Sequence, residues 1–236
     1  MSKTMRWILP GLLLGLVACG QRPSVEATVL RFTDVEPQSQ PTPVRMIITA
    51  DFLRIDDGTD AKTFVLYSRK ERIIYNVSDQ DRMVLAIPAG TVPAKPPAQL
   101  THSVEERPES VPTIAGHTVR RFLLKTNGKV CYDVYAAGNL LPGAVTALRE
   151  FINALASDQT QSSPRMPREL LTPCYLANNI HAPARYLDHG FPVRRAEPDG
   201  RVSELNDYQP SVRVDPALFV LPADLKRTNI RELRTR

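Results

Sequence analysis

The sequence predicts a mainly β protein of the α+β class, in which a helix covers one face of a curved antiparallel sheet. Short runs rich in Val, Ile, Tyr and Phe alternate with turn residues about every ten positions, a spacing typical of an antiparallel meander. Asn127-Gly128 separates two β-rich runs, which is the strongest short signal for a hairpin. Residues 142–156 carry a helical apolar stripe.

The first nineteen residues precede the predicted fold and have the pattern of an export signal. Lys3 and Arg6 supply positive charge, and an apolar run of about eleven residues follows, which is shorter than the roughly 20 residues of a membrane-spanning helix. Leu16-Val17-Ala18-Cys19 closes the run and resembles the lipobox of bacterial lipoproteins. An ordinary cleaved signal with an incidental cysteine is the alternative.

The lipobox resemblance implies a membrane anchor. Residues 1–18 would be a signal peptide, and residues 19–24 a tether with a diacylglycerol on the thiol of Cys19 and an acyl group on its amine. Two or more acyl chains hold a protein stably on a membrane. Gly20 and Gln21 follow, without the aspartate that favours retention in the inner membrane. We therefore expect a lipid-anchored protein on the outer membrane, facing the periplasm.

Composition bounds the remaining chain. We expect one domain at residues 25–225 and a basic tail at residues 226–236. Hydrophobic residues make up 42% of the chain and charged residues 23%, which excludes a disordered protein. The net charge is +5, and Lys3 and Arg6 leave with the signal, so no nucleic-acid-binding surface is predicted.

The first half of the domain is predicted to be a meander. Residues 27–35 form the first strand, and residues 36–43, with three prolines, form a loop. The next β-rich runs are residues 44–56, 62–67, 72–77 and 83–87. The runs at 64–67 and 83–87 are apolar on both faces, whereas a sheet with one solvated face alternates. We therefore expect the second face of these strands to be covered.

Residues 88–112 hold six prolines and are predicted to be a long loop between two halves of the fold. The second half opens with the hairpin of residues 117–125 and 129–136. In the helix that follows, Pro142 suits the first turn, and the stripe has 3,4,3 spacing. The stripe residues are Val145, Leu148, Ile152 and Leu155.

The last part of the domain is predicted from turn signals. Residues 168–178 are expected to hold a short helix interrupted at Pro173. Pro198-Asp199-Gly200 lies between two runs, residues 191–196 and 201–205, and predicts a hairpin. Residues 211–214 are predicted to be the last strand.

Two cysteines remain if Cys19 is acylated. In an exported protein the pair Cys131 and Cys174 predicts a disulfide, which would staple the second hairpin arm to the segment after the helix. Metal ligation with His181 or His189 is the alternative, but the close C-x-x-C or H-x-x-x-H spacing of metal sites is absent. We predict a disulfide, no metal and no cofactor.

Motifs of catalysis are absent. The sequence has no G-x-S-x-G, no Gly-rich phosphate loop and no H-E-x-x-H. No nucleophile is placed beside a histidine by the sequence, as a base–nucleophile pair requires. Asp56, Asp57 and Asp60 lack the D-x-D-x-D-G spacing of a calcium loop and are predicted to belong to a turn. We expect a protein that is not an enzyme.

Five short segments carry a resemblance to a known family. They are Phe52-Leu53-Arg54-Ile55-Asp56, Phe64-Val65-Leu66-Tyr67, Ile73-Ile74-Tyr75-Asn76-Val77, Ile114-Ala115-Gly116-His117 and Leu218-Phe219-Val220-Leu221-Pro222. In order, they resemble bacterial envelope proteins of unassigned function that look like the periplasmic lipoprotein carrier and its outer-membrane receptor. The resemblance spans residues 25–224. It implies an unclosed antiparallel half-barrel with a helix packed on the concave face, and an apolar cavity between them.

The two-faced strands and the single helix predict a groove. A helix of about fifteen residues is roughly 22 Å long and covers only part of a sheet with strands about 4.8 Å apart. We expect a groove beside the helix that binds an apolar, lipid-like ligand, with the loop of residues 88–112 near its mouth. The candidate lining residues are Leu66, Tyr75, Leu85, Leu148 and Ile152. The alternative is a structural or assembly lipoprotein that binds another envelope protein and no small molecule.

Overall fold

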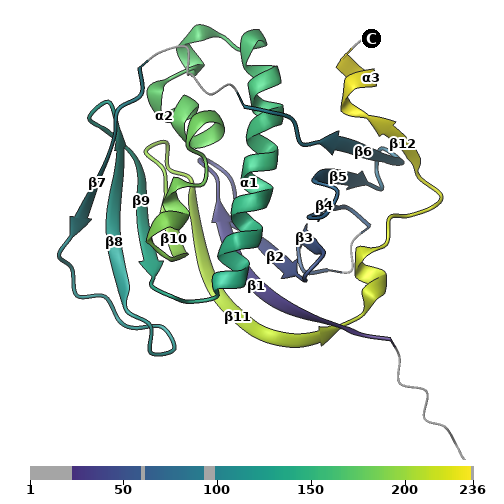
Figure 1. Cartoon of the computed structure of the whole chain (residues 1–236), viewed down its shortest axis with the longest axis horizontal. Coiled ribbons are helices and arrows are strands. Elements are labelled where there is room, and N and C mark those ends of the chain that lie inside the picture. Colours follow the sequence, from purple (N-terminus) through teal and green to yellow (C-terminus); the bar gives the residue numbers. More distant parts are fainter. Residues whose placement is uncertain (1–22, 60–61, 93–98, 235–236) are drawn as a thin grey trace, which may run out of the picture.

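The computed structural model describes residues 23–59, 62–92 and 99–234, and β-strands dominate it (Figure 1). The strands of the first half are β1 (Val25–Val35), β2 (Thr42–Ile48), β3 (Phe52–Asp56), β4 (Phe64–Ser68), β5 (Ile73–Ser78) and β6 (Met83–Pro88). Those of the second half are β7 (His102–Arg107), β8 (Val119–Thr126), β9 (Lys129–Ala137), β10 (Phe191–Ala196), β11 (Val202–Val214) and β12 (Lys226–Asn229).

These strands form a single sheet in the order β12-β6-β5-β4-β3-β2-β1-β11-β10-β9-β8-β7. The outermost strands, β12 and β7, do not pair with each other, so the sheet is unclosed. All pairings between these strands are antiparallel except that of β12 with β6, which is parallel. The predicted fold class, a mainly β protein with an unclosed antiparallel sheet and a helix packed against it, is confirmed.

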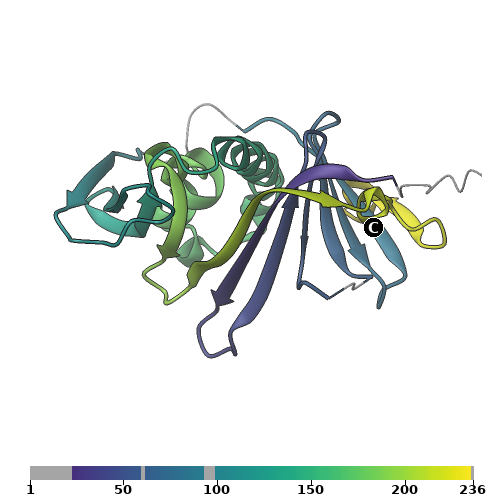
Figure 2. The same ribbon diagram turned by 90° about the horizontal axis from the view of Figure 1, so that it is seen from below.

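Helices lie mainly in the second half of the chain. The α-helices are α1 (Pro142–Ser162), α2 (Pro173–Leu176) and α3 (Ile230–Arg234). A π-helical turn, η3 (Ala177–His181), continues α2, and 3₁₀ turns include η4 (Arg185–His189) and η5 (Pro216–Phe219). The sheet bends so that β7 to β10 lie on one side of α1 and β2 to β6 on the other (Figures 1 and 2).

The hairpin around Asn127-Gly128 is confirmed. Asn127 has φ 49° and Gly128 has φ 77°, the positive values that a two-residue type I′ turn requires at both central positions. β8 and β9 pair antiparallel on either side of this turn. The helix predicted from the 3,4,3 stripe is also present as α1, but it continues to Ser162, beyond the predicted end at residue 156.

One predicted strand run is two strands. Residues 44–56 contain β2 and β3, joined by a tight turn that has neither Gly nor Pro. The hydroxyl of Thr49 accepts hydrogen bonds from the backbone N–H groups of Asp51 (3.3 Å) and Phe52 (2.9 Å). Ser and Thr hydroxyls stabilise such turns only weakly, so this turn has little signature in the sequence.

The predicted loop of residues 88–112 contains a strand. β7 pairs with β8 from His102–Thr126 to Arg107–Arg121, and it is exposed along nearly its whole length. Its sequence is mostly polar and charged, which is usual for an edge strand. The pairing therefore depends on β8 rather than on the β propensity of these residues.

The predicted basic tail also contributes to the sheet. β12 extends the sheet beside β6, and α3 follows it, so residues 226–234 are part of the fold rather than a tail beyond residue 225. The predicted strand at residues 211–214 is the end of β11, which pairs with β1 over nearly its whole length.

Two apolar clusters lie on opposite faces of β1 to β5. On the helix face, Leu53, Tyr67 and Ile74 pack into a cluster with residues of α1 and of β8 to β10. On the other face, Leu66, Val77 and Val84 pack into a smaller cluster with Phe219 and Leu225. We call residues 215–225 the strap, because they cross this second face, and we call the face itself the strap face. The expectation that the second face is covered is confirmed.

Candidate ligand-binding site

The structure does not bring the five predicted groove residues together. Leu148 is 6% exposed in the helix-face cluster, and Ile152 packs against that cluster. Leu66 and Tyr75 lie opposite each other in the β4–β5 ladder and belong to the strap face. Leu85 lies on the helix face, because it is opposite Asn76 in the sheet and Asn76 is opposite Val65, which packs against the helix-face cluster. The prediction that all five line one groove is therefore wrong, because the sheet separates them.

A small cavity lies beside Leu148 on the helix face. Its volume is about 80 Å³, and Phe32, Met46 and Tyr186 also line it. Ligand sites are typically about 300–1,000 Å³, so this cavity is too small to hold a lipid-like ligand.

Arg195 lies at the polar end of this small cavity. Its guanidinium stands 4.7 Å from the ring centroid of Tyr186 and 5.6 Å from that of Tyr132, and both rings are buried. Burial, the largest cause, raises the pKa of both phenols, and the positive charge of Arg195 opposes the shift. Both aromatic rings therefore lie close enough to the guanidinium of Arg195 to stabilise its positive charge inside the fold.

A larger cavity lies on the strap face, between the strap and the ends of β3, β4 and β5. Its volume is about 590 Å³, within the usual range of small-molecule sites. Its apolar lining residues are Phe64, Ala217, Leu218, Val220, Pro222 and Leu225. Its charged lining residues are Arg54, Lys62, Asp79, Asp215 and Asp224. We call it the strap cavity.

A buried ionic cluster adjoins the strap cavity through Arg54, which lines it. The carboxylate of Asp56 accepts hydrogen bonds from Nε of Arg54 (2.7 Å) and from Nε and Nη2 of Arg45 (2.7 and 2.9 Å). Burial acts to raise the pKa of Asp56, but the hydrogen bonds from Arg45, Arg54 and the N–H of Gly58 outweigh it and lower that pKa. The guanidinium of Arg54 also lies 3.8 Å from the ring centroid of Phe64, which fixes the wall beside it.

The strap is fastened at several points along its length. The ring of Phe219 stacks on Phe52 at 5.6 Å, and Nη1 of Arg54 donates to the carbonyl of Leu218 (2.7 Å). Arg82 pairs with both Asp79 and Asp224 at the far end. These contacts preform the cavity without a ligand. In contrast, Val220 is 65% exposed, which leaves an apolar side chain at the edge.

The strap cavity could not be predicted from the sequence for two reasons. Arg54 and Asp56 alternate with apolar residues in β3, a pattern that normally marks a solvated face. Residues 218–222 form an apolar segment, and nothing local shows which face they cover. Arg54 and Asp56 are two positions apart, so they lie on the same face of a strand, and this spacing of opposite charges could have indicated an ion pair.

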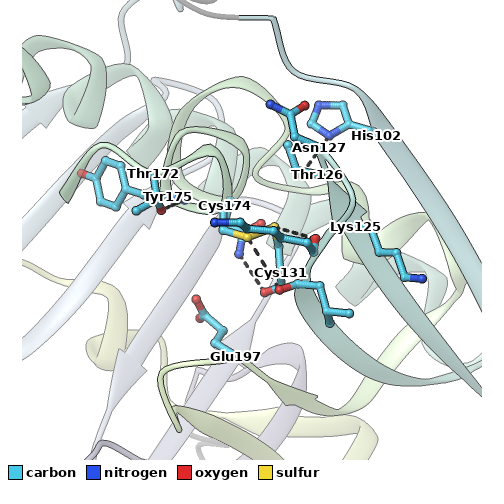
Figure 3. The surroundings of a disulfide bond; sticks show 12 residues. His102, Lys125, Thr126, Asn127, Cys131, Thr172, Cys174, Tyr175 and Glu197 are labelled. Carbon is cyan, nitrogen blue, oxygen red and sulfur yellow. Dashed lines mark hydrogen bonds between the residues drawn. A yellow bond between two sulfur atoms is a disulfide. The ribbon is translucent and has the colours of Figure 1, made fainter. Parts of the chain in front are cut away.

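The predicted disulfide between Cys131 and Cys174 is present and joins β9 to α2 (Figure 3). Beside it, Nδ2 of Asn178 donates to the carbonyl of Cys131 (3.1 Å), and Oδ1 of Asn178 accepts from Nη2 of Arg185 (2.9 Å). Nη1 of Arg185 donates to Oγ1 of Thr126 (2.9 Å). The network holds the helical segment onto the β8–β9 hairpin, so its role is structural.

His102 belongs to the same network. Its Nδ1 lies 3.0 Å from Nη1 of Arg185, and Figure 3 shows its ring beside Thr126. Burial and then the positive charge of Arg185 lower the pKa of His102. A neutral ring accepts a hydrogen bond from the guanidinium, so this histidine contributes a structural acceptor.

Within the described ranges, no three His, Cys, Asp or Glu side chains are grouped so that they could hold a metal ion. The described part of the chain also has no helix that is long and apolar enough to span a bilayer. Cys19, the predicted lipidation residue, and Asp60, assigned to a turn, lie outside the described residues.

No protein-family model and no curated protein matches this chain. A solved structure of an uncharacterized conserved protein from Thermus thermophilus is similar, with a TM-score of 0.44 and 9% identity over 87% of this chain and 91% of that one. Two structures of PNGF-II, in different space groups, have TM-scores of 0.42 and 0.40 with 9% and 10% identity. Each match covers 89% of this chain, but only 32% and 33% of the two PNGF-II chains. Likeness at this level assigns no function.

Proposed function

We propose that this protein is a lipoprotein of the bacterial cell envelope, anchored through Cys19, and that it binds an apolar ligand in the strap cavity. The anchor rests on the charged start, the apolar run and the lipobox-like Leu16-Val17-Ala18-Cys19. The Cys131–Cys174 bridge supports export, because disulfides persist in oxidising compartments. Gly20 and Gln21 after the cysteine favour the outer membrane, facing the periplasm.

The strap cavity is the observation that carries the ligand-binding function. It is preformed, has a volume of about 590 Å³, and combines apolar walls with charged groups at its floor and rim. Three of the charged lining residues already form ion pairs: Arg54 with Asp56, and Asp79 and Asp224 with Arg82. A ligand with an apolar body and little net charge fits such a site best, since it would not compete with these pairs.

The anchor is tested by fractionation. The Cys19→Ser protein is expected to leave the membrane fraction or to keep its signal, because no acyl chain can be attached. The N-terminal peptide of the wild-type protein should carry the mass of the lipid in mass spectrometry. Wild-type protein without that mass, and unchanged fractionation of Cys19→Ser, would reject the lipoprotein proposal.

Ligand binding is tested with a fluorescent fatty-acid probe on the unlipidated Cys19→Ser protein. Ala217→Trp places a large ring in the cavity from an exposed position, so it should weaken probe binding at least about tenfold while leaving the fold intact. Leu148→Ala is the matched control in the helix face. It should lower stability by about 2–4 kcal/mol without changing probe affinity while the protein is folded.

Two outcomes would change this assignment. Loss of binding in Leu148→Ala but not in Ala217→Trp would move the ligand to the helix face. No probe binding by the parent protein would favour the second candidate, an assembly lipoprotein that binds another envelope protein. The exposed edge strand β7 supports that candidate, because its outward N–H and C=O groups can pair with an added strand.

A further inference from the structure

The described chain begins next to the strap cavity. Val25, the first residue of β1, pairs with Val214, and the following residue, Asp215, lines the cavity. Val25 also packs against the strap-face cluster that contains Phe64. Both ribbon views place the start of β1 beside η5 of the strap (Figures 1 and 2). The first described residues, which follow the tether of the proposed lipid anchor, therefore lie on the cavity side of the molecule.

Arg213 holds the chain at this point. Its Nε donates to Oγ of Ser24 (3.0 Å), and its Nη2 donates to the carbonyl of Ser24 (2.8 Å). Cys19 precedes Ser24 by five residues, and five residues span at most about 17 Å at roughly 3.3–3.6 Å each. An acyl chain on Cys19 is thus confined to the neighbourhood of the strap.

We propose that one of the acyl chains attached to Cys19 occupies the strap cavity of the same molecule. This inference rests on the proposed lipidation and names the ligand of the proposed site. The chain lies between Phe64, Leu218 and Leu225, with Val220 covering it at the edge. The paired charges at the rim lie where the polar linkage of the chain emerges. The two remaining acyl chains are enough to hold the protein on the membrane.

The tether favours occupancy of the strap cavity by the attached acyl chain over occupancy by the acyl chain of a free lipid. Both have the same chemistry, but a covalent connection of a few residues raises the effective concentration of the attached chain to the millimolar range. A free lipid must in addition leave its own bilayer. The attached chain therefore occupies the cavity first, and an added fatty acid has to displace it.

Amide hydrogen exchange of the strap tests this occupancy. The lipidated wild-type protein and the Cys19→Ser protein are compared in the same phosphatidylglycerol–phosphatidylethanolamine vesicles. Amides of residues 215–225 should exchange about tenfold more slowly in the lipidated protein, because an occupied cavity suppresses local opening of the strap. Ala217→Trp in the lipidated protein should abolish this difference. Amides of β8 and β9 are the internal reference and should not change.

The outcomes separate this inference from the proposed function. Equal strap exchange in lipidated and Cys19→Ser proteins, with lipid confirmed by mass, would overturn the inference and leave the anchor intact. Equal, strong protection of both proteins by vesicles, relative to buffer, would assign the cavity to bilayer lipid and also overturn it. A wild-type protein that carries no lipid would reject both. If Ala217→Trp does not fold, Val220→Trp at the cavity edge replaces it in the same comparison.

Discussion

At the scale of single residues, Asp56 has the greatest consequence. Its side chain is fully buried, while those of Arg54 and Arg45 are 5% and 15% exposed, so one carboxylate compensates two guanidinium groups inside the fold. Removing one partner of a buried ion pair leaves a charge without compensation, which costs more than the pair itself contributes. Arg54 also lines the strap cavity, so the stability of this ionic cluster and the geometry of the cavity are coupled.

We expect Asp56→Asn to lower the free energy of unfolding by about 3 kcal/mol at neutral pH, because both arginines lose their carboxylate. Urea unfolding followed by circular dichroism measures the change. The neighbouring Asp57→Asn is the control, since Asp57 is exposed and accepts hydrogen bonds from Thr59 of its own turn. Similar losses of stability in the two variants would contradict this account.

Asp56 also makes stability depend on pH in a defined direction. Its pKa in the folded protein lies below the ordinary value of 3.8. The carboxylate therefore contributes its full stabilisation above about pH 4, and the contribution is lost as the pH falls through the lowered pKa. The wild-type urea midpoint should fall more steeply below about pH 4 than that of Asp56→Asn. Parallel pH profiles would show that the cluster contributes no such linkage.

At the scale of elements, the disulfide has the clearest measurable effect. It joins α2 to β9 and closes a loop between two cysteines that are 43 positions apart in the sequence. The chain-entropy model gives such a loop about 4 kcal/mol of stabilisation. The double variant Cys131→Ala, Cys174→Ala should lose roughly that amount, 3–4 kcal/mol, in urea unfolding.

A reduced wild-type protein is the matched comparison for that double variant. Both should retain the sheet, because β8 and β9 are joined through their own hairpin. Unchanged stability after reduction would mean that Asn178 and Arg185 alone hold the helical segment in place.

Sequence patterns predicted the elements that carry their own signals. Asn127-Gly128 specifies a turn through backbone conformation, and the stripe around Leu148 specifies a helix through its period, so both were confirmed. β7 and β12 carry no such signal, because each becomes a strand by pairing with the edge of a sheet that already exists. The Thr49 turn was missed because it contains neither Gly nor Pro, the residues that most strongly mark a turn in a sequence.

At the scale of the whole molecule, the strap completes the fold by covering a second apolar face. Phe64, Leu66, Val77 and Val84 are all buried on that face, and the strap supplies Phe219 and Leu225 to their cluster. The candidate site could not be predicted from local sequence for this reason. It forms between segments that are about 150 residues apart, and only the complete topology brings them together.

We expect truncation after Val214 to expose this face and cause association. The shortened protein should elute as oligomers in size-exclusion chromatography and bind a hydrophobic dye, because exposed apolar patches of several hundred Å² promote association. Truncation after Asn229 removes only α3 and the residues beyond it, and should leave the protein monomeric. A monomeric protein without residues 215–236 would show that the strap is dispensable.

The pairing of β1 with β11 has a consequence for the order of folding. Val25 pairs with Val214, so β1, the first strand of the domain, cannot pair with β11 until almost the whole domain has been synthesised. Until then the meander β1 to β6 can form, but the edge of β1 that faces away from β2 stays unpaired. Contacts of such long sequence separation slow folding, typically to milliseconds or seconds. The nascent chain therefore presents an open strand edge for most of its synthesis, and it depends on being kept from other chains until β11 emerges.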